Sequence, residues 1–157
     1  GQDACVAAVR AESAAITLWL ADRTDSDALV PAPGSPERAV FLRWLIFLVA
    51  NIYPCFTFAD DPARFVSVEE ARKPFREAVD AHEQRLWAMV EADAAGPWFL
   101  GARLSAIDIY IAVMTKWRPG RAWFAANAPR LSAIATAVEA IPALRDAIAA
   151  NHDPLTD

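Results

Sequence analysis

The chain has 157 residues, of which 55% are hydrophobic and 22% charged, a composition typical of a folded globular protein and not of a disordered one. This length allows a single domain with a sizeable core. The formal net charge of -5 at pH 7 argues against a nucleic-acid partner, because such binding usually needs a basic surface. Alanine is abundant and only 5 residues are glycine, so helices are favoured over strands.

The two cysteines and the apolar runs indicate in which compartment the protein is found. Cys5 and Cys55 lie far apart and belong to no metal-ligand or disulfide pattern, so we expect no metal and a reducing, cytoplasmic location. Residues 1–10 lack the charged start and long apolar run of a signal peptide. The longest apolar run, 44–53, is about half the length of a membrane span and is followed by Pro54. It therefore predicts a core helix and no membrane association.

The first third of the chain predicts a short strand, two helices and two connections. An apolar run at Cys5–Val9 predicts the strand, and a helix is expected from about Arg10 to Ala21. Residues 22–35 are largely polar with Pro and Gly, which is typical of a linker. A second helix is expected over 36–53, because Pro36 suits a first helical position and Pro54 an end, and 54–66 is expected to be irregular.

A long helix is expected in the middle of the chain. Ser67 and Glu70 are spaced as a capping box, which predicts a helix from there to about Asp93. Pro74 lies inside it and is expected to kink it. Its inward stripe is marked by apolar residues and one histidine, three and four positions apart: Phe75, Val79, His82, Leu86, Met89 and Val90. On this pattern His82 is more often a hydrogen-bonded core side chain than a catalyst.

The remaining helices are bounded by caps and prolines. One is expected from Ser105 to about Arg118, another from Pro129 to the residue before Pro142, and a last one from Pro142 to a frayed tail at 153–157. Six helices with one vestigial strand predict an all-α bundle.

The start of the fourth helix carries a specific signal. Ser105 occupies an N-cap position and Asp108 the third helical position, so each side chain can bond the backbone N–H of the other residue. Leu104 and Ile109 flank this capping box at positions that suit a hydrophobic staple. We expect Ser105 and Asp108 to be structural.

Two segments of the chain resemble the glutathione transferase family. Residues 11–22, Ala-Glu-Ser-Ala-Ala-Ile-Thr-Leu-Trp-Leu-Ala-Asp, look like the family's E-S-x-A-I-x-x-Y-L-A run, with Trp19 in place of Tyr. Residues 99–109 resemble the F-L-G…S-x-x-D-I capping box of its helical domain, and both segments occur in the family's order.

The resemblance implies an all-α C-terminal-type bundle that follows the remnant of a thioredoxin-like domain. The remnant would be residues 1–23, comprising the last strand and helix of that domain, 24–35 the linker, and 36–157 the helical domain. The family's catalytic Tyr, Ser or Cys belongs to the part of the thioredoxin-like domain without a counterpart here. No catalytic residue is therefore expected in the chain as given.

The resemblance also places a glutathione site. Glu12 and Ser13 match the family positions that hold the γ-glutamyl end of glutathione. A carboxylate can pair with the ammonium group of this ligand, while a hydroxyl and free N–H groups at a helix start can receive its carboxylate. The ordinary alternative is helix N-terminal chemistry, since Ser and Glu are common there.

In the family, the helices that correspond to 36–53 and 105–118 line the pocket for the electrophile. Residues on them that suit an apolar substrate are Asn51, Tyr53, Tyr110, Met114 and Trp117. For each of them plain core packing is the alternative. Cys55 has no basic neighbour in sequence and is expected to be an inert buried thiol.

The function implied is conjugation of glutathione, as substrate, to small hydrophobic electrophiles when the N-terminal domain is present. The partners implied are a second copy, bound through the first two long helices of the helical domain, and the electrophile. A non-catalytic helical module for protein–protein interaction is the alternative, and an unrelated helical ligand-binding domain is a third possibility.

Overall fold

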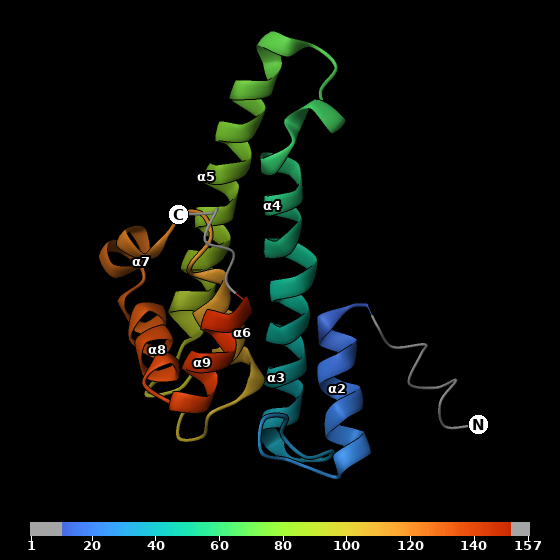
Figure 1. Ribbon diagram of the computed structural model, residues 1–157, viewed down its shortest axis with the longest axis vertical. Coiled ribbons are helices and arrows are strands. Elements are labelled where there is room, and N and C mark those ends of the chain that lie inside the picture. The colour runs from blue at the N-terminus through green and yellow to red at the C-terminus, as the bar shows by residue number, and fades with distance from the viewer. Residues whose placement is uncertain (1–10, 152–157) are drawn as a thin grey trace, which may run out of the picture.

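Helices form nearly all of the regular structure in residues 11–151, the part of the chain that this computed structural model describes (Figure 1). Within those residues no strand occurs, and the pairing of Trp98 with Gly101 is an isolated bridge. The expectation of an all-α fold is confirmed. The strand predicted at Cys5–Val9 and the frayed tail at 153–157 lie outside the described residues, and the predicted domain boundaries stay a prediction.

The helices form a long pair with a smaller group beside it. In chain order they are α2 (Ser13–Thr24), α3 (Pro36–Phe47), a π-helical turn (Leu48–Ile52), α4 (Tyr53–Asp60), a 3-10 turn (Pro62–Arg64), α5 (Glu69–Asp93), α6 (Ala106–Met114), α7 (Arg121–Asn127), α8 (Pro129–Glu139) and α9 (Pro142–Asn151). The continuous α3–α4 helix runs beside α5, α6 packs on α8, and α2 lies on the outer side of α3 (Figure 1).

The second predicted helix does not end before Pro54, and the irregular connection predicted from residue 54 starts only after Asp60. Proline has no N–H, and its ring collides with the carbonyl four residues earlier in a regular helix. The π-helical turn Leu48–Ile52 inserts a wider turn just before it, so that Pro54 falls in the first turn of α4, where no N–H is needed.

The joined helix is long and apolar enough to cross a membrane by length and composition alone. Its 25 residues exceed the apolar run 44–53, because the helix continues past Pro54. Phe41, Trp44 and Leu45 on this helix are buried, and the helix contacts α5 and α6. Part of its apolar surface therefore packs within this fold, whereas Val40 and Ile46 are exposed.

The capping box predicted at Ser67 does not form. Helix α5 begins one residue later than the box requires, with Val68 at the N-cap and no side-chain cap. A serine outside the N-cap position cannot receive the N–H groups of the first turn. Glu69 and Glu70 still place negative charge at the positive end of the helix dipole, and the helix continues without interruption through Pro74 to Asp93.

The inward face of α5 also differs from the predicted stripe. His82 and Met89 are exposed, so the expectation of a core histidine is wrong. Glu83 and Trp87 are buried instead, one helical turn apart. Reasoning from polarity assigns a glutamate to the solvent side, yet here the indole N–H of Trp87 satisfies its carboxyl group.

The fourth predicted helix ends early, and an extra helix follows. Helix α6 stops at Met114, and turns over 115–120 lead into α7, which the sequence pattern did not predict. Helix α6 is the centre of the core, where Ile107, Ile111 and Ala112 are fully buried. The short turns after it place residues 116–120 beside α4, where they form one wall of a cavity.

Candidate functional site

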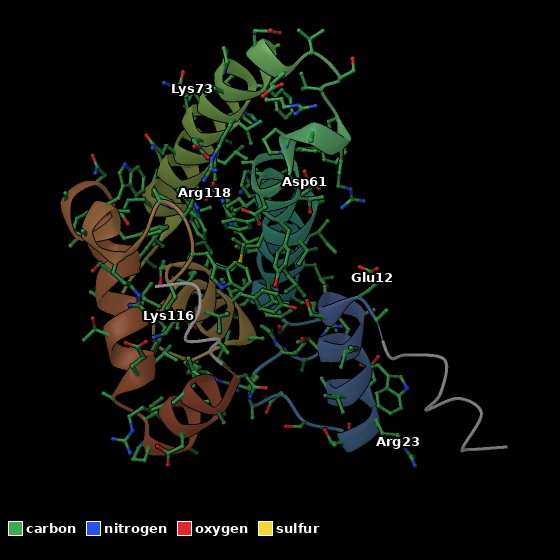
Figure 2. The ribbon with its side chains drawn as sticks, turned by 45° about the horizontal axis from the view of Figure 1, so that its top comes forward. Glu12, Arg23, Asp61, Lys73, Lys116 and Arg118 are labelled. Carbon is green, nitrogen blue, oxygen red and sulfur yellow. The ribbon has the colours of Figure 1, made fainter. Side chains whose placement is uncertain are left out.

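A cavity of about 640 Å³ lies between α4 and the segment that follows α6. We call it the Tyr53–Trp117 cavity. It is lined by Tyr53, Phe56, Thr57, Asp60, Lys116, Trp117, Arg118, Pro119 and Gly120. Figure 2 shows Lys116 and Arg118 on the side of the molecule away from α2. This volume is in the range that holds small ligands.

Three aromatic rings form the apolar wall of this cavity. The Trp117 ring meets Tyr53 edge-to-face at 5.4 Å and Phe56 at 5.1 Å between ring centroids. Tyr53 and Phe56 meet at 6.2 Å with nearly perpendicular planes. Such edge-to-face contacts stabilise aromatic pairs beyond simple burial. The three rings therefore hold one another in fixed positions and present an apolar surface to the cavity.

The five residues predicted for the electrophile pocket do not all meet. Tyr53 and Trp117 line the same cavity, and Tyr110 lines a neighbouring apolar hollow of about 270 Å³ between α2 and α6. Met114 is 1% exposed and packs in the core. Asn51 lies in a separate groove between α4 and α5, and its amide donates to the Phe47 carbonyl at 3.3 Å.

Tyr53 and Tyr110 offer two phenol groups near the cavity. Burial raises the pKa of Tyr53, and the neighbouring Tyr110 raises it further. The hydroxyl oxygen of Tyr110 is buried with no hydrogen-bond partner in the part of the chain that the structure describes. The Tyr53 phenol therefore stays protonated at neutral pH, and both hydroxyl groups can donate to an acceptor on a bound molecule.

A charged bridge borders the cavity. Nη1 of Arg118 donates to Oδ1 of Asp60, and its Nε donates to Oδ1 of Asp80 at 3.2 Å. Its guanidinium carbon lies 5.7 Å from the centroid of the Phe56 ring. Sequence reasoning missed Arg118, because it stands between Trp117 and Pro119 at the expected end of a helix, where a basic residue needs no special role.

Behind this bridge lies a buried carboxyl group. Glu83 is 1% exposed, and its Oε1 accepts from Nε1 of Trp87 at 3.1 Å. Burial raises the pKa of Glu83 to about 7, against the lowering effects of the Trp87 bond and of Arg118. The nearby Cys55 thiol is buried and donates to the Asn51 carbonyl at 3.4 Å, and burial raises its pKa as well. A raised pKa makes this thiol a poor nucleophile.

The predicted glutathione residues stand at the start of α2. Glu12 has φ 63°, in the left-handed region that non-glycine residues rarely adopt, and no side chain caps the helix. Glu12 and Ser13 are both exposed. The first N–H groups of the helix have no acceptor within it, and Figure 2 shows Glu12 at the opposite end of α2 from Arg23. Strained backbone of this kind is concentrated at binding sites.

Ser105 and Asp108 form a capping box at the start of α6. The backbone N–H and the hydroxyl of Ser105 donate to Oδ2 of Asp108 at 2.7 and 2.9 Å. The N–H of Phe99 donates to the other carboxylate oxygen at 2.7 Å, a bond that the sequence pattern did not reveal. Burial raises the pKa of Asp108 while these donors oppose the rise. These contacts hold the loop, and neither residue lines the Tyr53–Trp117 cavity.

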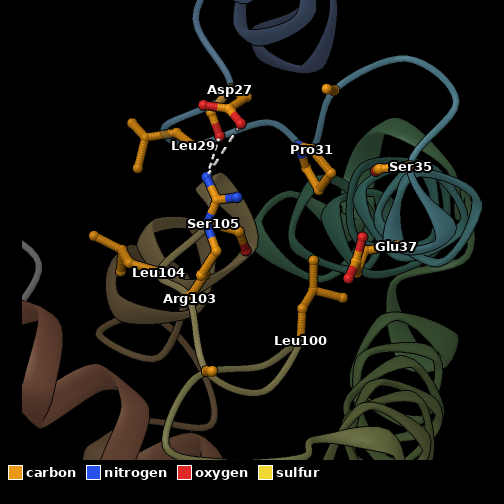
Figure 3. A pocket seen from close by; sticks show the side chains of 11 residues that line it. Asp27, Leu29, Pro31, Ser35, Glu37, Leu100, Arg103, Leu104 and Ser105 are labelled. Atoms are coloured by element: carbon orange, nitrogen blue, oxygen red, sulfur yellow. Dashed lines mark hydrogen bonds and ion pairs between the residues drawn. The ribbon is translucent and has the colours of Figure 1, made fainter.

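A smaller cavity of about 190 Å³ adjoins the capping box, between the linker and residues 100–105 (Figure 3). Nη2 of Arg103 donates to the Asp27 carbonyl at 2.9 Å and lies 3.6 Å from its carboxylate. The N–H of Ala106 donates to the Leu29 carbonyl at 2.8 Å. These bonds fasten the linker to the loop, and no residue predicted for substrate binding lies here.

Similarity to known proteins decides the family. The chain is 38% identical over 145 residues to YncG of Escherichia coli K12, described as an uncharacterized GST-like protein, and the match covers 92% of this chain and 69% of that protein. The chain belongs to the glutathione transferase family. No protein-family model matches it.

Two solved transferase structures share the fold. BphK, a bacterial GST determined as a ternary complex, superimposes with a TM-score of 0.68 at 28% identity, over 89% of this chain and 67% of BphK. A glutathione transferase from Methylococcus capsulatus gives a TM-score of 0.66 at 28% identity, over 88% and 66%. The chain thus spans about two thirds of the length of these relatives, and the match includes its helical bundle.

Proposed function

We propose that this chain forms the helical part of a glutathione transferase that conjugates glutathione to small hydrophobic electrophiles in the cytoplasm. In this proposal a thioredoxin-like domain activates the glutathione thiol, and the Tyr53–Trp117 cavity receives the electrophile. The observation that carries the proposal is this cavity of about 640 Å³ with its wall of three aromatic rings, in a chain of the transferase family.

The start of α2 is proposed as one edge of the glutathione site. Glu12 and Ser13 are exposed, and the strained backbone of Glu12 leaves the first turn of α2 uncapped. The carboxylate of Glu12 would pair with the ligand's ammonium, and the helix N-terminus with Ser13 would receive its carboxylate. Within residues 11–151 no cluster suited to a metal ion is present, and the proposed reaction uses none.

A second copy of the chain is proposed as partner. A groove of about 360 Å³ is lined by residues of α4, of the π-helical turn before it and of α5, and we call it the α4–α5 groove. It is lined mainly by apolar residues: Ala50, Asn51, Pro54, Cys55, Phe58, Phe75, Ala78, Val79 and His82. Exposed apolar side chains nearby, Ile46 and Met89 among them, extend this face along both helices.

The deciding experiment uses protein expressed from the whole reading frame. We expect retention on immobilised glutathione and chloride release from 1-chloro-2,4-dinitrobenzene, with the glutathione sulfur replacing chlorine on the ring. Glu12→Gln is expected to weaken glutathione binding by about tenfold through loss of one charged pair. The matched control Glu37→Gln, on α3, is expected to bind as the wild type does. Absence of both retention and conjugation would contradict the proposal and favour a non-catalytic interaction module.

A further inference from the structure

The segment that carries Trp117 leaves the regular helix before it reaches the cavity. Helix α6 ends at Met114, and residues 115–120 continue as turns. Local bonds hold its first part, where the N–H groups of Lys116 and Trp117 donate to carbonyls three residues earlier. These bonds fix the backbone of the turns, while the position of the segment against α4 depends on side chains.

Two charged residues anchor this segment on opposite sides. Lys116 lies 2.9 Å from the Glu139 carboxylate, which joins the segment to α8. Arg118 joins it to Asp60 at the end of α4 and to Asp80 on α5. Trp117 stands between these two anchors, with its ring against Tyr53 and Phe56.

The ion pairs of Arg118 are better suited to fixing the position of this segment than to stabilising the fold. Its side chain is 26% exposed and that of Asp80 32% exposed, so both groups give up part of their hydration when they pair. A guanidinium can reach two carboxylates on different helices at fixed angles, whereas an ammonium is a single point of charge. The Arg118 side chain also lies against the Phe56 ring that touches Trp117.

We propose that Arg118 is a positioning residue, which holds Trp117 against Tyr53 and Phe56 and thereby fixes the aromatic wall of the Tyr53–Trp117 cavity. The inference rests on the proposed function in assuming that this cavity receives the electrophile. Arg118 itself makes no contact with the reacting atoms in this proposal. It acts through Trp117, whose ring presents the surface on which an aromatic substrate would pack.

The test follows Trp117 directly. The chain is labelled with 5-fluorotryptophan, and the Trp117 signal in the ¹⁹F NMR spectrum is assigned with the Trp117→Phe variant. Spectra of Arg118→Gln and Arg118→Lys are compared with those of Arg103→Gln, which removes an exposed arginine that does not line the cavity. Each protein is then titrated with 1,3-dinitrobenzene, an unreactive aromatic probe.

In Arg118→Gln we expect the Trp117 signal to shift or broaden while other tryptophan signals stay in place, and Kd for the probe to rise by about tenfold. Arg118→Lys should recover part of both effects, and Arg103→Gln should match wild type. A Trp117 signal and Kd unchanged in Arg118→Gln would overturn the proposal. Should that variant fail to fold, Asp60→Asn cuts the more exposed contact and is judged by the same two readouts.

The two proposals fail in different ways. Should the probe leave the Trp117 signal of the wild type unmoved, the assignment of this cavity to the electrophile is wrong. The spectra of the free proteins still decide whether Arg118 holds the ring, because they need no ligand.

Discussion

The Glu83 side chain places a carboxyl group in the interior beside Trp87, with Arg118, Asp80 and Asp60 around it. Its pKa is raised from 4.5 to about 7, chiefly by burial. Between these two values the folded state keeps a proton that the unfolded state has lost. The free energy of unfolding therefore falls as pH rises through this window, by roughly 3 kcal/mol in total.

We expect Glu83→Gln to remove this dependence. Glutamine has the same shape, keeps an oxygen for Trp87 and carries no charge, so the two proteins should have similar stability at pH 5. At pH 8 the wild type contains a buried carboxylate, and the variant should be more stable by roughly 2 kcal/mol. Urea unfolding at both pH values measures the difference. If the free energy of unfolding depends on pH equally in the two proteins, folding does not raise the pKa of Glu83.

At the residue scale, the structure brings together two of the five residues that the sequence singled out. Tyr53 and Trp117 line one cavity and Asn51 lines another groove, and the binding of an electrophile there stays a prediction. The π-helical turn Leu48–Ile52 ends between Asn51 and Tyr53, and a wider turn changes the direction of every side chain that follows. A pattern of 3.6 residues per turn cannot reveal such a turn. Arg118 and Glu83 were missed because charged residues are normally assigned to solvent.

At the scale of single helices, α2 has left-handed residues at both ends. Glu12 precedes it with φ 63° and Asp25 follows it with φ 49°. A side chain disfavours this region, whereas glycine adopts it freely, so Glu12→Gly and Asp25→Gly should each raise the free energy of unfolding by about 0.5–1 kcal/mol. Glutamate tolerates the region less well than aspartate, so the gain should be larger at Glu12.

The same two variants distinguish the effect of backbone strain on stability from the role of Glu12 in glutathione binding. With protein from the whole reading frame, Glu12→Gly should be more stable yet lose retention on immobilised glutathione, whereas Asp25→Gly should be more stable and keep it. Thermal unfolding and retention are measured on the same samples. Full retention by Glu12→Gly would remove Glu12 from the proposed glutathione site.

The helix predictions that failed involve a proline or the end of a helix. The pattern found α2, α3, α5, α6, α8 and α9, and the last five of these each have a proline, an acidic first turn or a cap near the start. It ended the α3 helix at Pro54, although the π-helical turn carries the chain past it to Asp60. It omitted α7, whose 7 residues are too few to show a helical period.

At the scale of the whole molecule, the α3–α4 helix and α5 lie side by side (Figure 1), and the α4–α5 groove with the exposed apolar side chains near it forms one face. Phe58 and Met89 on this face are 38% and 48% exposed. Exposed apolar patches on stable proteins commonly mark interfaces, and the family generally forms dimers. The face is therefore where we expect the second copy to bind.

Placing a charge in the α4–α5 groove should separate the two copies. Ala78 lines the groove, and glutamate keeps a high helix propensity there while burying a charge in the expected interface. We expect wild-type protein to sediment as a dimer and Ala78→Glu as a monomer with a folded circular dichroism spectrum. Ala88→Glu, an exposed alanine of α5 that does not line the groove, should remain a dimer. A monomeric wild type, or a dimer of Ala78→Glu as tight as that of Ala88→Glu, would show that this groove faces solvent.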